Sequence, residues 1–314
     1  MSKSPRRGRL IDNIVGRGAE SRLASHLSKL NFGGGSMLKV SLCVASALFV
    51  ASPAYAQLQL PKTPVSAKAC GGDEDGGYAA ALRKLGYQPS VNKGSLDILE
   101  KIDAGVCDVG MVQGDALLIY QRRPNPGPVK NGVIQVAYRE AALLICNEYT
   151  KIKTIADVKA GTNVLVGPAE GGPALTWDSL STIFANLKTA TLNKLGNPNS
   201  DRTLARLRSS TEKVDCVFNV TAPGAATIKA FDDAGAKLDL IAIADKRIAT
   251  LQTSDGRKPY FDATIPAGTF KNLQASVKGA VVPTVTVDAL VVGNKDWMTK
   301  NPDEVKRIAA FKLN

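Results

Sequence analysis

The sequence predicts an α/β fold of two similar lobes, each a mixed sheet flanked by helices, with a ligand cleft between the lobes. The first observation is residues 94–115, where a Gly-Ser helix start, a short amphipathic helix, a glycine stop and an apolar strand follow one another. The run Val109–Val112 is continuously apolar, as in buried parallel strands. Gln113 and Asp115 end this strand, and polar groups at the carboxyl end of such a strand face the ligand crevice of an open α/β sheet.

A second stretch, residues 201–223, repeats this layout. A predicted helix, Asp201–Ser209, leads into a predicted strand, Val214–Val220, with a cysteine near its beginning. The amide Asn219 and the hydroxyl of Thr221 lie near the end of this strand, as Gln113 does in the first stretch. The repeat predicts two half-sites that face each other.

Two glycine-rich loops are the third observation. Residues 71–77 lie between a predicted strand, Val65–Cys70, and a predicted helix, Ala79–Leu85, and residues 167–172 follow a predicted strand, Asn163–Val166. Free backbone N–H groups and a helix dipole at such loops favour an anion. A tight turn with solvated acids fits the first loop equally well, because it contains three consecutive acidic residues and no phosphate-binding lysine.

The remaining segments alternate between helix and strand. Helices are predicted at Asp115–Gln121, Ile155–Gly161 and Pro302–Lys312, and strands at Val133–Tyr138, Ala141–Cys146, Leu238–Ala244 and Val281–Val292. Residues 245–268 are expected to be irregular. The polar pair Arg139-Glu140 interrupts two strands and marks the expected crossing between lobes. We therefore expect lobe I to comprise residues 57–140 and 275–314, and lobe II residues 141–274.

The distribution of charge along the chain limits the classes of partner that the protein can bind. The chain has 314 residues and a formal net charge of +12, but residues 1–36 contribute seven Lys or Arg against two acids. The remainder is mildly basic, which suits a small anionic ligand or an acidic partner surface. No basic run with interleaved aromatic residues occurs, so we predict no nucleic-acid partner.

Residues 37–56 have the pattern of a cleaved secretory signal peptide. Lys39 supplies the positive start, Val40–Val50 the apolar core, and Ala54-Tyr55-Ala56 the small-residue cleavage site. A membrane anchor is disfavoured because the apolar run is shorter than the about 20 residues that span a bilayer. The sequence thus predicts a periplasmic protein, with residues 1–36 as an upstream extension whose simplest explanation is a misassigned start.

Cleavage would remove the only histidine, His26. The remaining chain would lack every catalytic arrangement and metal site that depends on histidine, so we predict no catalytic residue, no metal and no cofactor. Four cysteines would remain in a compartment that permits disulfides, and we expect them to be buried or paired rather than reactive. They are Cys70, Cys107, Cys146 and Cys216.

Several segments together resemble one family. They are the Cys-Gly-Gly loop through Gly77-Tyr78, Gly94–Asp97, Cys107–Ala116, Leu144–Asn147, Val166–Pro168 with Thr176-Trp177, and Ile265–Phe270. These segments are similar to TAXI-type extracytoplasmic solute-binding proteins of TRAP transporters, over most of residues 65–298. The resemblance implies a two-lobed type II periplasmic-binding fold that holds a small organic anion or amino acid in its cleft, and we expect the protein to be a monomer. It also implies delivery of that solute to a TRAP-type membrane permease.

The resemblance implies a ligand site made by both lobes. Backbone N–H groups would come from the two glycine loops, at Gly71, Gly72, Gly77, Gly167, Gly171 and Gly172. Ser95, Gln113, Asn219 and Thr221 would add side-chain hydrogen bonds, and Tyr78 or Trp177 an apolar wall. Ser95 as a plain helix cap and Trp177 as a core residue remain open alternatives.

This chain departs from the family pattern at the second loop. Gly171-Gly172-Pro173 stands where the family shows a Gly-Ser-Gly-type run, which removes a hydroxyl donor, and Glu170 adds a negative charge beside it. Both changes favour a ligand that carries an amine.

One disulfide follows if Ala141–Cys146 runs antiparallel beside Val214–Val220. The end of the first strand then lies near the start of the second, which places Cys146 close to Cys216.

Two other functions remain open at this point. A ligand-sensing protein without a transport role would share the cleft, and hydroxymethylbilane synthases share a related bilobed fold with a cofactor attached to cysteine. The signal peptide and the lack of an arginine-rich cleft sequence count against the enzyme.

Overall fold

The computed structural model describes residues 64–313, except 74–75, 125–128, 195, 197, 199–201, 210, 212, 223, 235–236 and 279. The predicted extension (1–36) and signal peptide (37–56) lie outside the described residues, as do Glu74, Asp75, Asp201 and Pro223. Among the residues described, no helix has the length and apolar character needed to cross a membrane.

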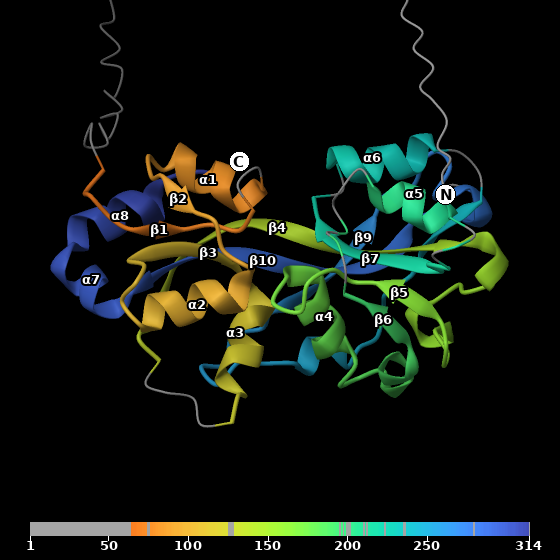
Figure 1. The fold of residues 1–314 in the computed structure, drawn as a ribbon, viewed down its shortest axis with the longest axis horizontal. Coiled ribbons are helices and arrows are strands. Elements are labelled where there is room, and N and C mark those ends of the chain that lie inside the picture. Colours follow the sequence, from red (N-terminus) through yellow and green to blue (C-terminus); the bar gives the residue numbers. More distant parts are fainter. Residues whose placement is uncertain are drawn as a thin grey trace, which may run out of the picture. The chain divides into compact units, whose positions relative to one another are not determined.

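Ten strands of the described chain form one continuous mixed sheet, which Figure 1 shows running through both halves of the molecule. Most strands are short, whereas β4 and β10 are long and extend through both lobes. The strands are β1 (Ala69–Cys70), β2 (Pro89–Ser90), β3 (Val109–Gln113), β4 (Asn131–Asn147), β5 (Asn163–Leu165), β6 (Thr191–Asn193), β7 (Cys216–Thr221), β8 (Leu238–Ile241), β9 (Tyr260–Ile265) and β10 (Val282–Asn294).

The two lobes repeat one strand order. Lobe I has the order β2-β1-β3-β10-β4, and lobe II has the order β6-β5-β7-β4-β8. In each lobe the first three strands are parallel and the fourth, which comes from a distant part of the chain, is antiparallel to them. The repeat confirms the predicted two-lobed mixed α/β fold, and it makes β3 and β7 the corresponding strands of the two predicted half-sites.

The chain passes between the lobes within strands rather than in loops. β4 pairs with β10 from Asn131 to Ala141 and with β7 from Ala141 to Cys146. β10 pairs with β9 from Val282 to Val287 and with β3 from Ala289 onward, so the second crossing falls near residue 287 rather than at the expected position 275. Two continuous strands therefore connect the lobes.

Helices cover both faces of each half of the sheet (Figure 1). In lobe I, α1, α7 and α8 cover one face and α2 and α3 the other, and in lobe II, α5 and α6 lie opposite α4. The helices are α1 (Gly77–Lys84), α2 (Ser95–Asp103), α3 (Gly114–Gln121), α4 (Gly172–Leu180), α5 (Arg202–Arg208), α6 (Ala226–Asp233), α7 (Lys295–Lys300) and α8 (Pro302–Ala310). Short 3-10 turns occupy Glu148–Thr150, Ile155–Asp157, Ala185–Thr189, Ile248–Thr250 and Ala275–Val277.

Helix α2 illustrates how the local sequence sets these elements. Leu96, Leu99 and Ile102 recur at helical spacing and are buried against β3. The helix ends before Gly105, whose φ of 72° suits glycine at a helix end. The polar side of the helix stays toward solvent.

Several predicted elements differ from those observed. β4 is one strand, so Arg139-Glu140 continues it rather than interrupting two strands. The segment expected to be irregular contains β9, and the helix predicted at Ile155–Gly161 is only a 3-10 turn. Val65–Cys70 contributes only two residues of strand.

Candidate functional site

A cavity of about 660 Å³ lies between the two lobes. Its walls come from the loops and helix starts that follow β1, β2, β5, β6 and β7, together with residues of β3 and β4. Lobe I contributes Gly72, Asp73, Gly76, Gly77, Tyr78, Lys84, Asn92–Ser95, Gln113, Tyr138 and Glu140, among others, and lobe II contributes Pro168, Gly171–Pro173, Pro198, Val220–Ala222, Ala225 and Thr227. The cavity therefore occupies the position that the carboxyl ends of the strands define.

Four helices begin at this cavity. The N-caps of α1, α2, α4 and α6 are Gly76, Gly94, Gly171 and Ala225, all of which line it. None of the four N-caps provides a side-chain hydrogen bond to its helix. Backbone N–H groups at uncapped helix starts need an acceptor, and the helix dipoles favour a negative charge there.

Gly94 lies at a close contact between the lobes. Its φ of 153° is open to glycine alone, and a Cβ at this position would lie 2.0 Å from the carbonyl oxygen of Glu170. Glycine is thus required both by the backbone conformation and by the contact between the lobes. Glu170 presents its backbone to this contact.

Gln113 links the lobes instead of pointing only at the cavity. Its Nε2 lies 2.6 Å from Oγ1 of Thr176, 2.7 Å from Oδ1 of Asp115 and 3.2 Å from the carbonyl oxygen of Gly172. Thr176 and Gly172 belong to α4 in lobe II. The side chain is buried, so its amide is held by protein acceptors in this structure.

Asp115 organises the same contact from a fully buried position. Its Oδ2 accepts hydrogen bonds from the Thr176 hydroxyl (2.6 Å) and from the Tyr260 hydroxyl (2.7 Å), both in lobe II. Burial raises the pKa of Asp115, while the hydrogen bonds from Thr176, Tyr260 and Gln113 oppose that rise. Asp115 therefore accepts hydrogen bonds that join the lobes.

Among the described residues that line the cavity, Glu140 is the buried carboxylate and Asp73 an exposed one. Glu140 lies on β4 where the strand crosses between lobes, and only 9% of its surface is exposed. Its Oε2 accepts a 2.7 Å hydrogen bond from the Tyr78 hydroxyl, and the Tyr138 ring lies 6.4 Å from the Tyr78 ring. Burial, with a smaller contribution from nearby Asp115, raises the pKa of Glu140 to about 7 against the lowering effect of the Tyr78 hydrogen bond.

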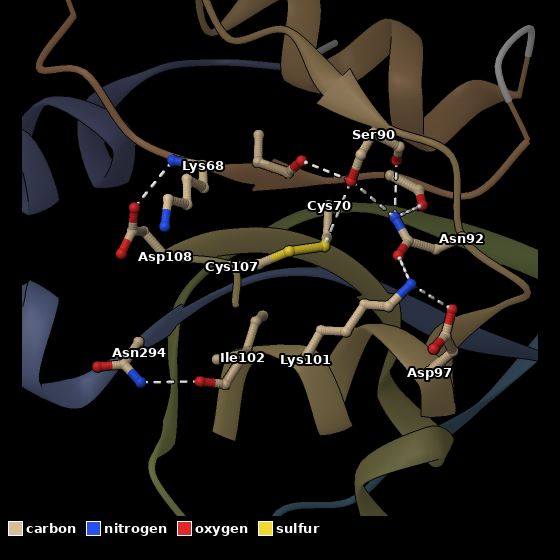
Figure 2. The surroundings of a disulfide bond; sticks show 12 residues. Lys68, Cys70, Ser90, Asn92, Asp97, Lys101, Ile102, Cys107, Asp108 and Asn294 are labelled. Atoms are coloured by element: carbon tan, nitrogen blue, oxygen red, sulfur yellow. Dashed lines mark hydrogen bonds and ion pairs between the residues drawn. A yellow bond between two sulfur atoms is a disulfide. The ribbon is translucent and has the colours of Figure 1, made fainter. Parts of the chain in front are cut away.

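The first glycine loop is fixed from behind by a disulfide and a polar network (Figure 2). Cys70 pairs with Cys107, which joins the end of β1 to the approach of β3. Asn92 Nδ2 donates to the carbonyl oxygens of Gly71 (2.9 Å) and Ser90 (2.7 Å), and its Oδ1 accepts from Lys101 Nζ (2.6 Å). These contacts hold the loop residues that line the cavity.

Eight of the twelve ligand residues predicted from the sequence line the cavity. They are Gly72, Gly77, Tyr78, Ser95, Gln113, Gly171, Gly172 and Thr221. Ser95 is also committed to the fold, because its Oγ accepts the backbone N–H of Gln113 at 3.0 Å.

The other four predicted residues lie outside the cavity lining. Trp177 is buried against Phe218 in the core of lobe II, as the core alternative proposed. Asn219 is fully buried in β7 and donates to the carbonyl oxygen of Pro198 at 3.4 Å. Gly71 packs near Pro89, and Gly167, with φ 76°, packs near Pro198.

Sequence reasoning missed Glu140, Tyr138, Asn92 and Thr227 as lining residues. The signal for Glu140 was its place beside the apolar run Ala141–Cys146, where an ionisable residue needs a reason to be buried. Tyr138 lies two residues earlier, on the same face of the strand.

A second cavity, of about 880 Å³, lies in lobe II away from the predicted site. It is lined by Asn147–Tyr149, Gly161, Asn163, Thr191, Leu207–Ser209, Lys213, Asp215, Lys237 and Leu238. None of the predicted ligand residues lines it. Within the described part of the chain, no three His, Cys, Asp or Glu residues are grouped as a metal site would require.

The family model described as "NMT1-like family" matches residues 79–301. This match covers both lobes and the whole cavity lining between Ala80 and Thr227. The chain belongs to the NMT1-like family. A search of curated protein sequences returns no match.

Similar solved structures include three binding proteins. The periplasmic aliphatic sulphonate-binding protein SsuA from Escherichia coli is 14% identical, with TM-score 0.43 and coverage of 77% of this chain and 70% of that one. Lactococcal OpuAC, in complex with glycine betaine, is 11% identical, with TM-score 0.45 and coverage of 78% and 84%. AbpA from Streptococcus pneumoniae, an amino-acid ABC transporter substrate-binding protein bound to L-arginine, is 13% identical, with TM-score 0.40 and coverage of 73% and 73%. Likenesses this weak do not bear on what the present chain binds.

Proposed function

We propose that this protein is an extracytoplasmic solute-binding protein that captures a small organic anion or an amino acid between its two lobes. The observation that carries the proposal is the convergence of four uncapped helix starts on one cavity. Their backbone N–H groups offer a carboxylate several donors without a buried counter-ion. The cavity volume, about 660 Å³, falls within the range usual for small-molecule sites.

The finer proposal is a TAXI-type protein that delivers its solute to a TRAP-type permease. It is supported by the sequence resemblance of residues 65–298, above all by Cys107–Ala116, which contains β3 and Gln113. We propose that the protein acts as a monomer. The cleft is formed by two lobes of one chain and needs no second copy.

A periplasmic location is supported by the signal-like residues 37–56 and by the cysteines. All four cysteines of the described chain form disulfides, Cys70–Cys107 and Cys146–Cys216, and disulfides persist in oxidising compartments. The same pairing weighs against a hydroxymethylbilane synthase, because Cys70 beside the glycine loop has no free thiol to hold a cofactor.

Native mass spectrometry of the exported protein tests the proposal. We expect a mass increment from a co-purified small molecule that disappears after denaturation and refolding. Adding the identified compound back should then raise the melting temperature without turnover. A catalytic product, or the absence of any stabilising compound among organic acids and amino acids, would contradict the proposal.

A further inference from the structure

The cavity contains a buried negative charge where an anion site would be expected to exclude one. Glu140 is 9% exposed, and its carboxylate accepts a hydrogen bond only from the neutral Tyr78 hydroxyl among the described residues. No Lys or Arg of the described chain lies within ion-pair distance of it. An isolated buried carboxylate is costly unless a cation or a proton accompanies it.

The positively charged side chains of the cavity lining lie nearer to the solvent than Glu140 does. Lys84 and Lys93 are both exposed, whereas Glu140 is buried. The lysines therefore interact with solvent at the cavity rim, and no Lys or Arg among the residues that the structure describes pairs with the carboxylate in the interior.

Two aromatic rings stand beside the carboxylate. Tyr78 lies in the first turn of α1 and Tyr138 lies two residues before Glu140 on β4, and both line the cavity. Their ring centroids are 6.4 Å apart and the planes are inclined at 57°. Aromatic faces beside a carboxylate form a typical environment for an ammonium group, because the ring quadrupole adds to the attraction of the charge.

We propose that Glu140, Tyr78 and Tyr138 form a subsite for a cationic group of the ligand, so that the preferred solute is a zwitterion such as an amino acid. This inference rests on the proposed solute-binding function. The helix starts would bind the carboxylate of the solute and Glu140 its ammonium group. The amine preference that the sequence suggested through Glu170 is thus assigned to a different residue.

The raised pKa of Glu140 agrees with this assignment. Burial disfavours the ionised form in the empty cavity, and a ligand ammonium group would restore it by pairing with the charge. A carboxylic acid without an amine would offer no such compensation.

Calorimetric titration of the ligand-free protein with L-amino acids and with the 2-oxo acids of the same side chains tests the subsite. The two series differ at the position of the ammonium group. We expect the amino acid with the highest affinity to bind at least about 30-fold more tightly than the 2-oxo acid with the same side chain. The reason is that the 2-oxo acid would leave the buried charge of Glu140 without a partner. Glu140→Gln should remove most of this preference by weakening amino-acid binding, with 2-oxo acid binding unchanged.

Two variants separate the subsite from a structural role. Glu148→Gln changes an exposed glutamate outside the cleft and should leave both affinities unchanged. Tyr78→Phe keeps the ring but removes the hydroxyl that contacts Glu140, and should weaken amino-acid binding less than Glu140→Gln does.

The outcomes separate the two proposals. Equal or tighter binding of 2-oxo acids, or a Glu140→Gln variant that weakens both series equally, overturns the cationic subsite while solute binding stands. A co-purified ligand without a cationic group overturns it as well. If neither series binds and no ligand co-purifies, both the solute-binding function and the subsite are rejected.

Discussion

At the scale of single residues, the cleft contains two buried carboxylates with different roles. Asp115 has three hydrogen-bond donors and lies within the contact between lobes, whereas Glu140 has one and faces the cavity. Asp115 was visible in the sequence as a polar residue after an apolar strand. In the sequence, Glu140 stood out only as part of a polar pair between two apolar segments. The alternation of side chains along a strand shows which residues share a face, but it does not show whether that face lines a cavity.

Glu140 makes the ligand-free protein less stable as pH rises. Its pKa is raised from 4.5 to about 7, so the folded state retains a proton that the unfolded state loses. Stability should therefore fall between about pH 4.5 and 7 and level off above, by an upper limit of about 3 kcal/mol. Tyr78, Tyr138 and Asp115 face this group, and none of them supplies a positive charge.

Urea unfolding of the ligand-free protein at pH 5 and pH 8 measures this loss. Glu140→Gln should be more stable than the unsubstituted protein at pH 8 and nearly equal to it at pH 5. Glu148→Gln should follow the unsubstituted protein at both pH values, and a Glu140→Gln variant that does the same would show that Glu140 is not buried as described.

The hydroxyl of Tyr260 should stabilise the protein measurably. It donates to the fully buried Asp115 at 2.7 Å, so Tyr260→Phe removes one donor from a buried carboxylate. We expect the free energy of unfolding to fall by about 1–3 kcal/mol. Tyr149→Phe is the matched control, because the Tyr149 side chain is exposed and its hydroxyl donates a hydrogen bond to Asp215. This substitution should change the free energy of unfolding by less than about 0.5 kcal/mol. Equal effects in urea unfolding would contradict this role for Tyr260.

At the scale of elements, the sequence predicted a helix or a strand correctly where the segment had a long apolar pattern or ended at a glycine. Helix α2, strand β3 and helix α8 were recognised for this reason. Short elements depend on distant partners: β9 forms because β10 offers it an antiparallel edge, and that pairing has no local signal. Helix α7 was missed although Asn294 caps it, accepting the backbone N–H groups of Asp296 and Trp297.

The disulfide between β4 and β7 gives a prediction at this scale. Cys146 and Cys216 are directly paired residues of antiparallel strands, and their bond closes a segment with a sequence separation of 70 residues. Replacing both by serine should lower the free energy of unfolding by about 2–4 kcal/mol. Non-reducing peptide mapping should find Cys146 linked to Cys216 and Cys70 linked to Cys107, and two free thiols at 146 and 216 in periplasmic material would contradict the assignment.

At the scale of the whole molecule, the repeated strand order explains why one cavity receives helix starts from both lobes. Each lobe directs the carboxyl ends of its parallel strands toward the cavity, and the corresponding strands β3 and β7 end at the cavity from different lobes. Sequence reasoning found this correspondence through the two helix–strand stretches. It could not predict that Gln113 and Asp115 bond to lobe II, because that contact depends on how closely the lobes approach.

The contact at Gly94 should decide whether the lobes can close on a ligand. Alanine there would place a Cβ 2.0 Å from the carbonyl oxygen of Glu170, so Gly94→Ala should hold the lobes apart and break the bonds from Gln113 to Gly172 and Thr176. The variant would then lose the contacts that form only when the lobes are closed. Because these contacts stabilise the closed state that holds the ligand, much of the ligand affinity should be lost as well.

Gly105→Ala is the matched control for this prediction. Gly105 also has a positive φ, but a Cβ there meets no other atom, so the substitution adds backbone strain of about 1–2 kcal/mol without affecting the contact between lobes. Small-angle X-ray scattering with saturating ligand should show a larger radius of gyration for Gly94→Ala than for Gly105→Ala, and calorimetry should show weaker binding only for Gly94→Ala. If both variants compact and bind alike, closure does not depend on this contact, and the bonds of Gln113 to lobe II belong to the rigid fold instead.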